Sequence, residues 1–82
     1  MRFKVYYRKN LKMSPGKLAA QVAHLACKAA MPWNMPCVVL SLTDAKFDEL
    51  KPKAHAIIAD AGRTEVAKGT ETCFGFFEET IK

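Results

Sequence analysis

Hydrophobic and polar side chains alternate near the start of the chain, in the order Phe3, Lys4, Val5, Tyr6, Tyr7 and Arg8. A period of two predicts a β-strand with one drier face, although Tyr6 blurs the pattern. Cys37–Leu42, which reads CVVLSL, is a nearly continuous apolar run, so we expect a central strand covered on both faces. Two more strands are predicted at Ala54–Ala59 and Thr70–Phe77, the latter with Gly75 as a bulge or a point of close approach.

Two segments between these strands have the pattern of helices. Ser14 is a favourable N-cap and Pro15 suits the first helical position, so a helix should run from there to about Ala30. This helix is apolar on most sides, which predicts that it is packed on most sides and leaves only a polar stripe to solvent. A second helix is capped by Thr43 and is limited by Pro52.

The order β-α-β-α-β-β predicts an α/β fold made of one domain over residues 1–82. We expect a compact three-layer α/β sandwich with a four-stranded mixed sheet and two main helices. Ser14–Lys17 and Asp60–Thr64 both follow strands. If those two strands are parallel, the two segments lie at the same edge of the sheet, where ligands gather in such folds.

Length and composition place the chain among small globular domains. Half of its 82 residues are hydrophobic, which excludes a disordered tail. So many apolar residues in so short a chain suggest that a partner subunit covers some of them, and a homodimer is one candidate. The net charge of +5 favours polyanionic partners such as tRNA or other nucleic acid, although a merely soluble basic domain would have the same charge.

Three cysteines, Cys27, Cys37 and Cys73, lack the spacing of a metal site or of a disulfide framework. We interpret them as buried small hydrophobic residues in a reducing cytosol. The start of the chain lacks the apolar run of a secretory signal, and no segment approaches the ~20 apolar residues of a membrane span. We therefore expect a cytoplasmic protein without a membrane span, a metal or a cofactor.

The polar stripe of the first helix consists of Lys17, Gln21, His24 and Lys28, at spacings of four, three and four residues. It is either the ordinary solvated face or a face for a ligand. Lys17 favours the second alternative, because an ammonium in the first turn opposes the helix macrodipole unless an anion balances it. The first-turn N–H groups are a natural anion site, and Gly16 lets a ligand approach the backbone closely.

The segment that follows the third strand begins with Asp60 and includes Arg63 and Thr64. As a plain turn, it needs Asp60 only to cap nearby N–H groups. As a functional segment, it lets Asp60 hold or deprotonate a water that Thr64 positions, with Arg63 on a phosphate. Thr72, in the fourth strand, offers another hydroxyl, although threonines are common in strands.

Two stretches, NLKMSPGKLAAQVAHLA and DAGRTEVAKGTETCFGF, resemble the signature segments of the type-2 peptidyl-tRNA hydrolases. Those enzymes cleave the ester that joins a peptide to the 3′ end of tRNA. The resemblance implies direct hydrolysis of peptidyl-tRNA by water, without a covalent enzyme intermediate. It places the catalytic side chains at Lys17, His24, Asp60, Thr64 and Thr72. We expect tRNA contacts at Gly16, Gln21, Lys28 and Arg63.

The chain also departs from the family pattern. Pro15 stands where a second lysine is usual, and Glu65 replaces a usual glutamine. The segment between Ala30 and Pro36 is shortened, and the family's C-terminal segment is lacking after the last matched strand. These differences leave open an alternative in which the chain is a non-catalytic module of this fold that binds RNA or a protein partner.

Overall fold

The computed structural model describes residues 1–60 and 68–79 of the chain. Within them the elements follow the predicted order. They are β1 (Arg2–Arg8), α1 (Pro15–Lys28), β2 (Cys37–Leu42), α2 (Asp44–Leu50), the 3₁₀ turn η1 (Lys51–Lys53), β3 (Ala56–Ala59) and β4 (Glu71–Glu78). Ser14 and Thr43 cap the two helices as expected, because their side-chain oxygens accept from the backbone N–H groups of Lys17 and Lys46.

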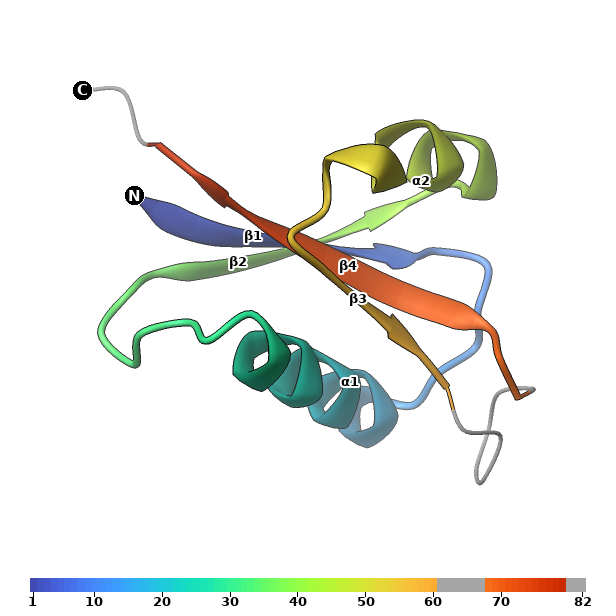
Figure 1. Ribbon diagram of the computed structural model, residues 1–82. Helices are drawn as coiled ribbons and strands as arrows, with labels where there is room; N and C mark the ends of the chain where they lie inside the picture. The colour runs from blue at the N-terminus through green and yellow to red at the C-terminus, as the bar shows by residue number, and fades with distance from the viewer. Residues whose placement is uncertain (61–67, 80–82) are drawn as a thin grey trace.

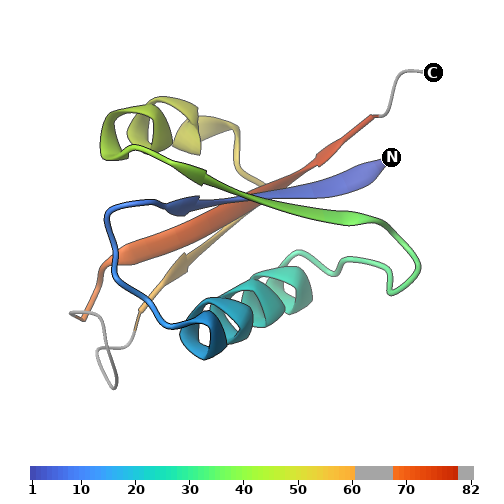
Figure 2. The same cartoon turned by 180° about the vertical axis from the view of Figure 1, so that it is seen from behind.

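The four strands form one mixed sheet in the order β2-β1-β4-β3. β2 is parallel to β1, whereas β4 is antiparallel to both β1 and β3. The helices α1 and α2 cover opposite faces of this sheet, which gives the three layers that the sequence predicted (Figures 1 and 2). Because β1 and β3 are both antiparallel to β4, they run in the same direction. The segments that follow them therefore start at the same edge of the sheet.

The core lies between α1 and the sheet, around Phe3, Val5, Leu25 and Cys73. Gly75 of β4 is the point of close approach that the sequence suggested. A Cβ atom added there would lie 2.5 Å from Cζ of Phe3 and 3.1 Å from Cδ2 of Leu25. The only register shift along the pairing of β3 with β4 falls elsewhere, between Ile58 and Ala59, so the bulge alternative at Gly75 was wrong.

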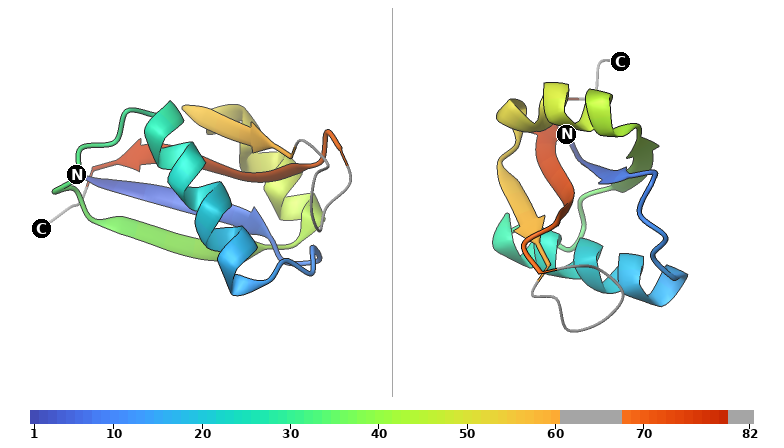
Figure 3. Two further views of the ribbon diagram at one scale, coloured as in Figure 1. Left: turned by 90° about the horizontal axis from the view of Figure 1, so that it is seen from below. Right: turned by 90° about the vertical axis from the view of Figure 1, so that its right-hand side faces the viewer.

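The position of β2 differs from the prediction. It is an edge strand that pairs with β1 alone among the described strands, and Val39 and Leu40 are 39% and 43% exposed. The prediction of a covered central strand was wrong because one helix per face cannot cover four strands. Figure 3 shows α1 crossing the sheet obliquely, and its main contacts with the sheet are with β4 and β3.

The outer flank of α1 is also more open than predicted. Leu18, Ala19, Val22 and Ala23 line a shallow apolar hollow together with Pro15 and with Val39 of β2. The expectation that α1 is packed on most sides was therefore wrong. The polar stripe is thus not the only face of α1 that is left to solvent. The stripe is also not fully exposed, because Gln21 is one of the two buried residues of the helix, with Leu25.

The three cysteines do not share one environment. Cys73 is buried, as expected, and burial raises the pKa of its thiol to about 11, so the thiol stays protonated at neutral pH. Cys27 and Cys37 are exposed, against the prediction. Cys27 lies near the end of α1 and is not among the buried residues of that helix, and Cys37 begins the edge strand β2.

Candidate active site

The fold brings the two predicted segments into direct contact. The Nζ atom of Lys17, in the first turn of α1, lies 2.5 Å from Oδ1 of Asp60, the residue that follows β3. The two residues are 43 positions apart in the chain. Their side chains are 12% and 2% exposed, so the ion pair is largely shielded from water and opens to solvent on the side of Lys17. Attraction between charges is stronger in such a setting than on the open surface.

This contact explains why a lysine occupies an unfavourable position in the first turn of a helix. An ammonium there opposes the macrodipole, but the Asp60 carboxylate supplies the balancing anion from within the chain. A charged acid and a charged base are thus held side by side before any substrate binds.

Gln21 joins this pair to a third element. Its Nε2 donates to Oδ1 of Asp60 over 3.0 Å, and its Oε1 accepts from Oγ1 of Thr72 on β4 over 2.8 Å. Gln21 is 5% exposed and Thr72 is 0% exposed. From its spacing, Gln21 was predicted to lie on the polar stripe and to contact tRNA, and this bridge was not predicted. A signal was present, because residue 21 lies four positions before the core residue Leu25 and hence on the same side of the helix.

The other predicted residues of α1 lie along the same helix. His24 is exposed. The Nζ atom of Lys28 donates to the backbone oxygen of Ile57 on β3 over 2.8 Å. Gly16 is exposed, and a Cβ atom built there would meet no atom within 4 Å, so its backbone is accessible from outside. Gly16, His24 and Lys28 thus form an exposed border beside the largely buried contacts of Asp60 with Lys17 and Gln21.

The backbone fixes Asp60 at its position. Its N–H donates to the oxygen of Thr70 over 2.8 Å, and its own oxygen accepts from the N–H of Gly69 over 2.7 Å. Gly69 has a φ of +83°, a backbone conformation that favours glycine. Arg63 and Thr64, which were predicted to bind phosphate and to orient a water, lie outside the described residues. Their roles remain predictions.

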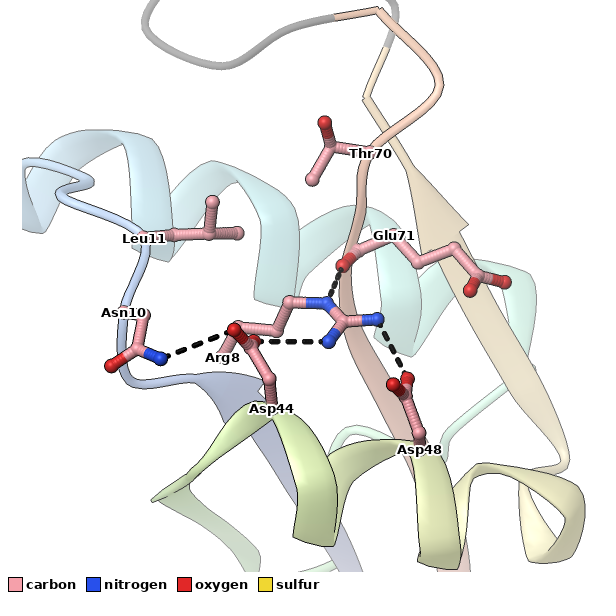
Figure 4. Close-up of a pocket in the computed structure, with 7 residues that line it drawn as sticks. All are labelled: Arg8, Asn10, Leu11, Asp44, Asp48, Thr70 and Glu71. Carbon is pink, nitrogen blue, oxygen red and sulfur yellow. Dashed lines mark hydrogen bonds and ion pairs between the residues drawn. The ribbon is translucent and has the colours of Figure 1, made fainter.

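A second polar cluster lies at the same edge of the sheet, next to Thr70 (Figure 4). It surrounds a hollow of about 530 Å³. Arg8, at its centre, donates to the backbone oxygen of Glu71 and to the carboxylates of Asp44 and Asp48, over 2.8, 3.0 and 3.0 Å. Hydrogen bonds from Asn10, and then from Arg8, lower the pKa of Asp44. The guanidinium thus binds carboxylates of the chain and links β1 to β4 and α2. We call this hydrogen-bonded cluster of Arg8, Asn10, Asp44, Asp48 and Glu71 the clasp.

The sequence did not predict the clasp, because Arg8, Asp44 and Asp48 lie outside the two signature segments and only the fold brings them together. Its acidic side chains would repel a phosphate. Within residues 1–60 and 68–79, no group of three or more His, Cys, Asp or Glu side chains is arranged to hold a metal ion. No helix in this part of the chain has the length and apolar character needed to cross a bilayer.

Comparison with known proteins gives a consistent result. Residues 1–80 match the model of the family described as peptidyl-tRNA hydrolase PTH2. The chain is 35% identical to a peptidyl-tRNA hydrolase of Metallosphaera sedula over 98 residues, covering 92% of this chain and 84% of that protein. It is 38% identical to one of Thermococcus onnurineus, over 80% of this chain and 74% of that protein. It is 32% identical to a peptidyl-tRNA hydrolase of Haloquadratum walsbyi, over 89% of this chain and 81% of that protein.

Proposed function

The chain belongs to the peptidyl-tRNA hydrolase PTH2 family, and on this premise we propose that it hydrolyses the ester bond of peptidyl-tRNA by direct attack of water at the Lys17–Asp60 site. The supporting observation is the 2.5 Å contact between a lysine ammonium and an aspartate carboxylate contributed by two distant segments. An acid–base pair at one edge of the sheet is what ester hydrolysis near a polyanion requires.

In the proposed reaction, Asp60 is the general base. Water attacks the carbonyl carbon of the ester while its proton passes to the Asp60 carboxylate. The tetrahedral intermediate carries a negative charge on oxygen, which the Lys17 ammonium offsets. Collapse of the intermediate breaks the bond to the ribose oxygen, and that oxygen takes up the proton. The products are a peptide with a free carboxylate and a tRNA with a free 3′-terminal hydroxyl.

The other predicted residues complete this proposal. Thr64 orients the attacking water and Arg63 contacts a phosphate. His24, with Gly16 and Lys28, borders the site on α1, where the exposed positive charge suits the tRNA backbone. The clasp around Arg8 has no part in this proposal, because its carboxylates already bind the guanidinium.

The decisive experiment measures release of an N-blocked amino acid from tRNA by the purified chain. We expect repeated turnover, with free tRNA accumulating, and a KM that rises with salt because phosphate contacts release counterions. Salt-sensitive binding of the same tRNA ester without turnover would contradict the proposal. That result would instead support the alternative of a non-catalytic RNA-binding module.

The open surface around β2 supports a homodimer as the assembly. Its sequence, CVVLSL, carries no charge, and an uncharged edge strand is a ready template for a second strand. Pairing through this uncharged strand would keep like charges out of direct contact between two copies that each carry a net charge of +5. Light scattering should give twice the chain mass of 9.1 kDa, and Val39→Lys should return the mass to that of one chain. A wild-type mass of 9.1 kDa at high concentration would contradict the dimer.

The proposed compartment is the cytoplasm. Cys27, Cys37 and Cys73 are all free thiols, which suits a reducing environment. Cell fractionation that recovers the protein outside the cytoplasmic fraction would contradict this assignment.

A further inference from the structure

We propose that Gln21 and Thr72 are positioning residues for Asp60: the Thr72 hydroxyl fixes the orientation of the Gln21 amide, and the amide fixes the carboxylate. The proposal rests on the proposed function and concerns the same site. It assigns Thr72 a role through Gln21, instead of the direct catalytic role that the family resemblance implied. It also assigns Gln21 to the acid rather than to tRNA.

The orientation of the amide follows from the chemistry of its two ends. A glutamine side chain has a donor end and an acceptor end of almost equal size, so its shape alone does not decide which end faces a carboxylate. Only the donor end is favourable there, because an amide oxygen would repel the carboxylate. Thr72 favours the same orientation of the amide through the end that lies away from Asp60. Its hydroxyl donates to Oε1 of Gln21, and this leaves Nε2 to face Asp60.

Among the described residues, the hydroxyl proton of Thr72 has one well-placed acceptor. The Oε1 atom of Gln21 is 2.8 Å away, whereas the backbone oxygen of Ile58 and the sulfur of Cys73 are 3.5 and 3.9 Å away. A hydroxyl has a single proton, and the shortest contact is the only one with the length of a strong hydrogen bond. Thr72 is also fully buried. The side chain is therefore placed to act on Gln21 rather than on a substrate.

Burying the polar side chains of Gln21 and Thr72 costs free energy of folding, so their burial suggests a functional role. Gln21 occupies the inward side of α1 beside Leu25, where an apolar residue of the same length would pack without any need for partners. The network is complete instead: no buried side-chain nitrogen or oxygen in the described part of the chain lacks a hydrogen-bond partner. Since Lys17 and Gln21 both donate to the same oxygen of Asp60, they fix the rotation of the carboxylate.

The test is a double-mutant cycle on the intact chain with Thr72→Val, Gln21→Met and the combined variant. Each single variant should lower kcat by about 10- to 100-fold, since misplacing a catalytic group by 1 Å costs on that order, while KM stays unchanged. The combined variant should be no slower than Gln21→Met alone, because Thr72 acts only through Gln21. Thr72→Ser, which keeps the hydroxyl, should restore most of the rate. Thr70→Val, two residues earlier, is the matched control.

Several outcomes would overturn the proposal. Losses that multiply in the combined variant would show that Thr72 acts independently of Gln21. A rise in KM with unchanged kcat would show that Gln21 contacts tRNA. A fall in Tm that accounts for the lost rate in all three variants would reduce the pair to a structural role. The combined variant also controls for folding, since it leaves no unpaired hydroxyl or amide at Thr72 and Gln21, and Asp60 keeps its ion pair with Lys17.

A measurement that does not depend on enzyme activity tests this proposal separately from the proposed function. Gln21 is the only glutamine of the chain, so its side-chain NH₂ signals can be assigned by NMR. They should be protected from exchange with water in the wild type. They should lose protection in Thr72→Val and keep it in Thr70→Val. Protection that survives Thr72→Val overturns the positioning role even if the enzyme is active. Absence of wild-type turnover with the expected NMR result would instead count against the proposed reaction alone.

Discussion

Replacing Asp60 with asparagine should lower kcat for hydrolysis of peptidyl-tRNA by about 10²- to 10⁴-fold, the range attributed to a positioned general base. The amide has the size of the carboxylate but cannot take up the proton of the attacking water. It also leaves the Lys17 ammonium, which lies 2.5 Å from the carboxylate in the wild type, without its counter-charge. The measurement is release of an N-blocked amino acid from tRNA at saturating substrate.

The control for this variant is Asp48→Asn, another aspartate whose carboxylate binds a cationic side chain. Asp48 bonds to Arg8 in the clasp, its side chain is 58% exposed, and it lies outside the proposed site. Its kcat should stay within about twofold of the wild type, because exposed ion pairs contribute little. Equal rates for Asp60→Asn and the wild type would contradict the role of Asp60. Binding of tRNA should persist in the inactive variant.

Replacing Gly75 with alanine should have the largest effect on stability. The added Cβ would lie 2.5 Å from Cζ and 3.0 Å from Cε2 of Phe3, whose ring is fully buried and cannot move aside. Overpacking of this kind typically costs about 1–3 kcal/mol. In a chain of this size each kcal/mol lowers Tm by about 4–8 °C. Thermal unfolding followed by circular dichroism measures the shift.

Gly16→Ala is the matched control, because the same substitution there adds a methyl group to open space. It should leave Tm unchanged or raise it slightly, since a glycine replaced without strain stabilises by about 0.4–1 kcal/mol. Equal melting temperatures for Gly75→Ala and the wild type would contradict the close packing of β4 against Phe3.

The sequence predicts local structure well here because its signals are local. Ser14 and Thr43 cap helices through bonds to residues three positions later. The alternation at the start of the chain places Phe3 and Val5 on the buried side of β1. The convergence of the two segments was also predictable, because it follows from the direction of two parallel strands and needs no detail of side-chain packing.

What the sequence does not reveal is how far one helix reaches across a sheet. CVVLSL has the composition of a central strand, yet β2 is at the edge because strand order depends on contacts between distant segments. The burial of the Gln21 side chain likewise depends on contacts between distant segments. The spacing places it on a stripe with Lys17, but the rotation of α1 against β3 and β4 decides that the stripe is partly buried. The partners of Gln21 are 39 and 51 positions away in the chain.

The most direct measurement is an NMR titration of the protein with a stable, amide-linked analogue of the 3′-terminal peptidyl-adenosine. The account predicts that the largest shift changes fall on Lys17, Gln21 and Asp60, with His24 beside them. Changes centred on the apolar hollow at Val39, or on the clasp at Arg8, would contradict it. The ester would then be bound at a part of the surface where Asp60 cannot reach it.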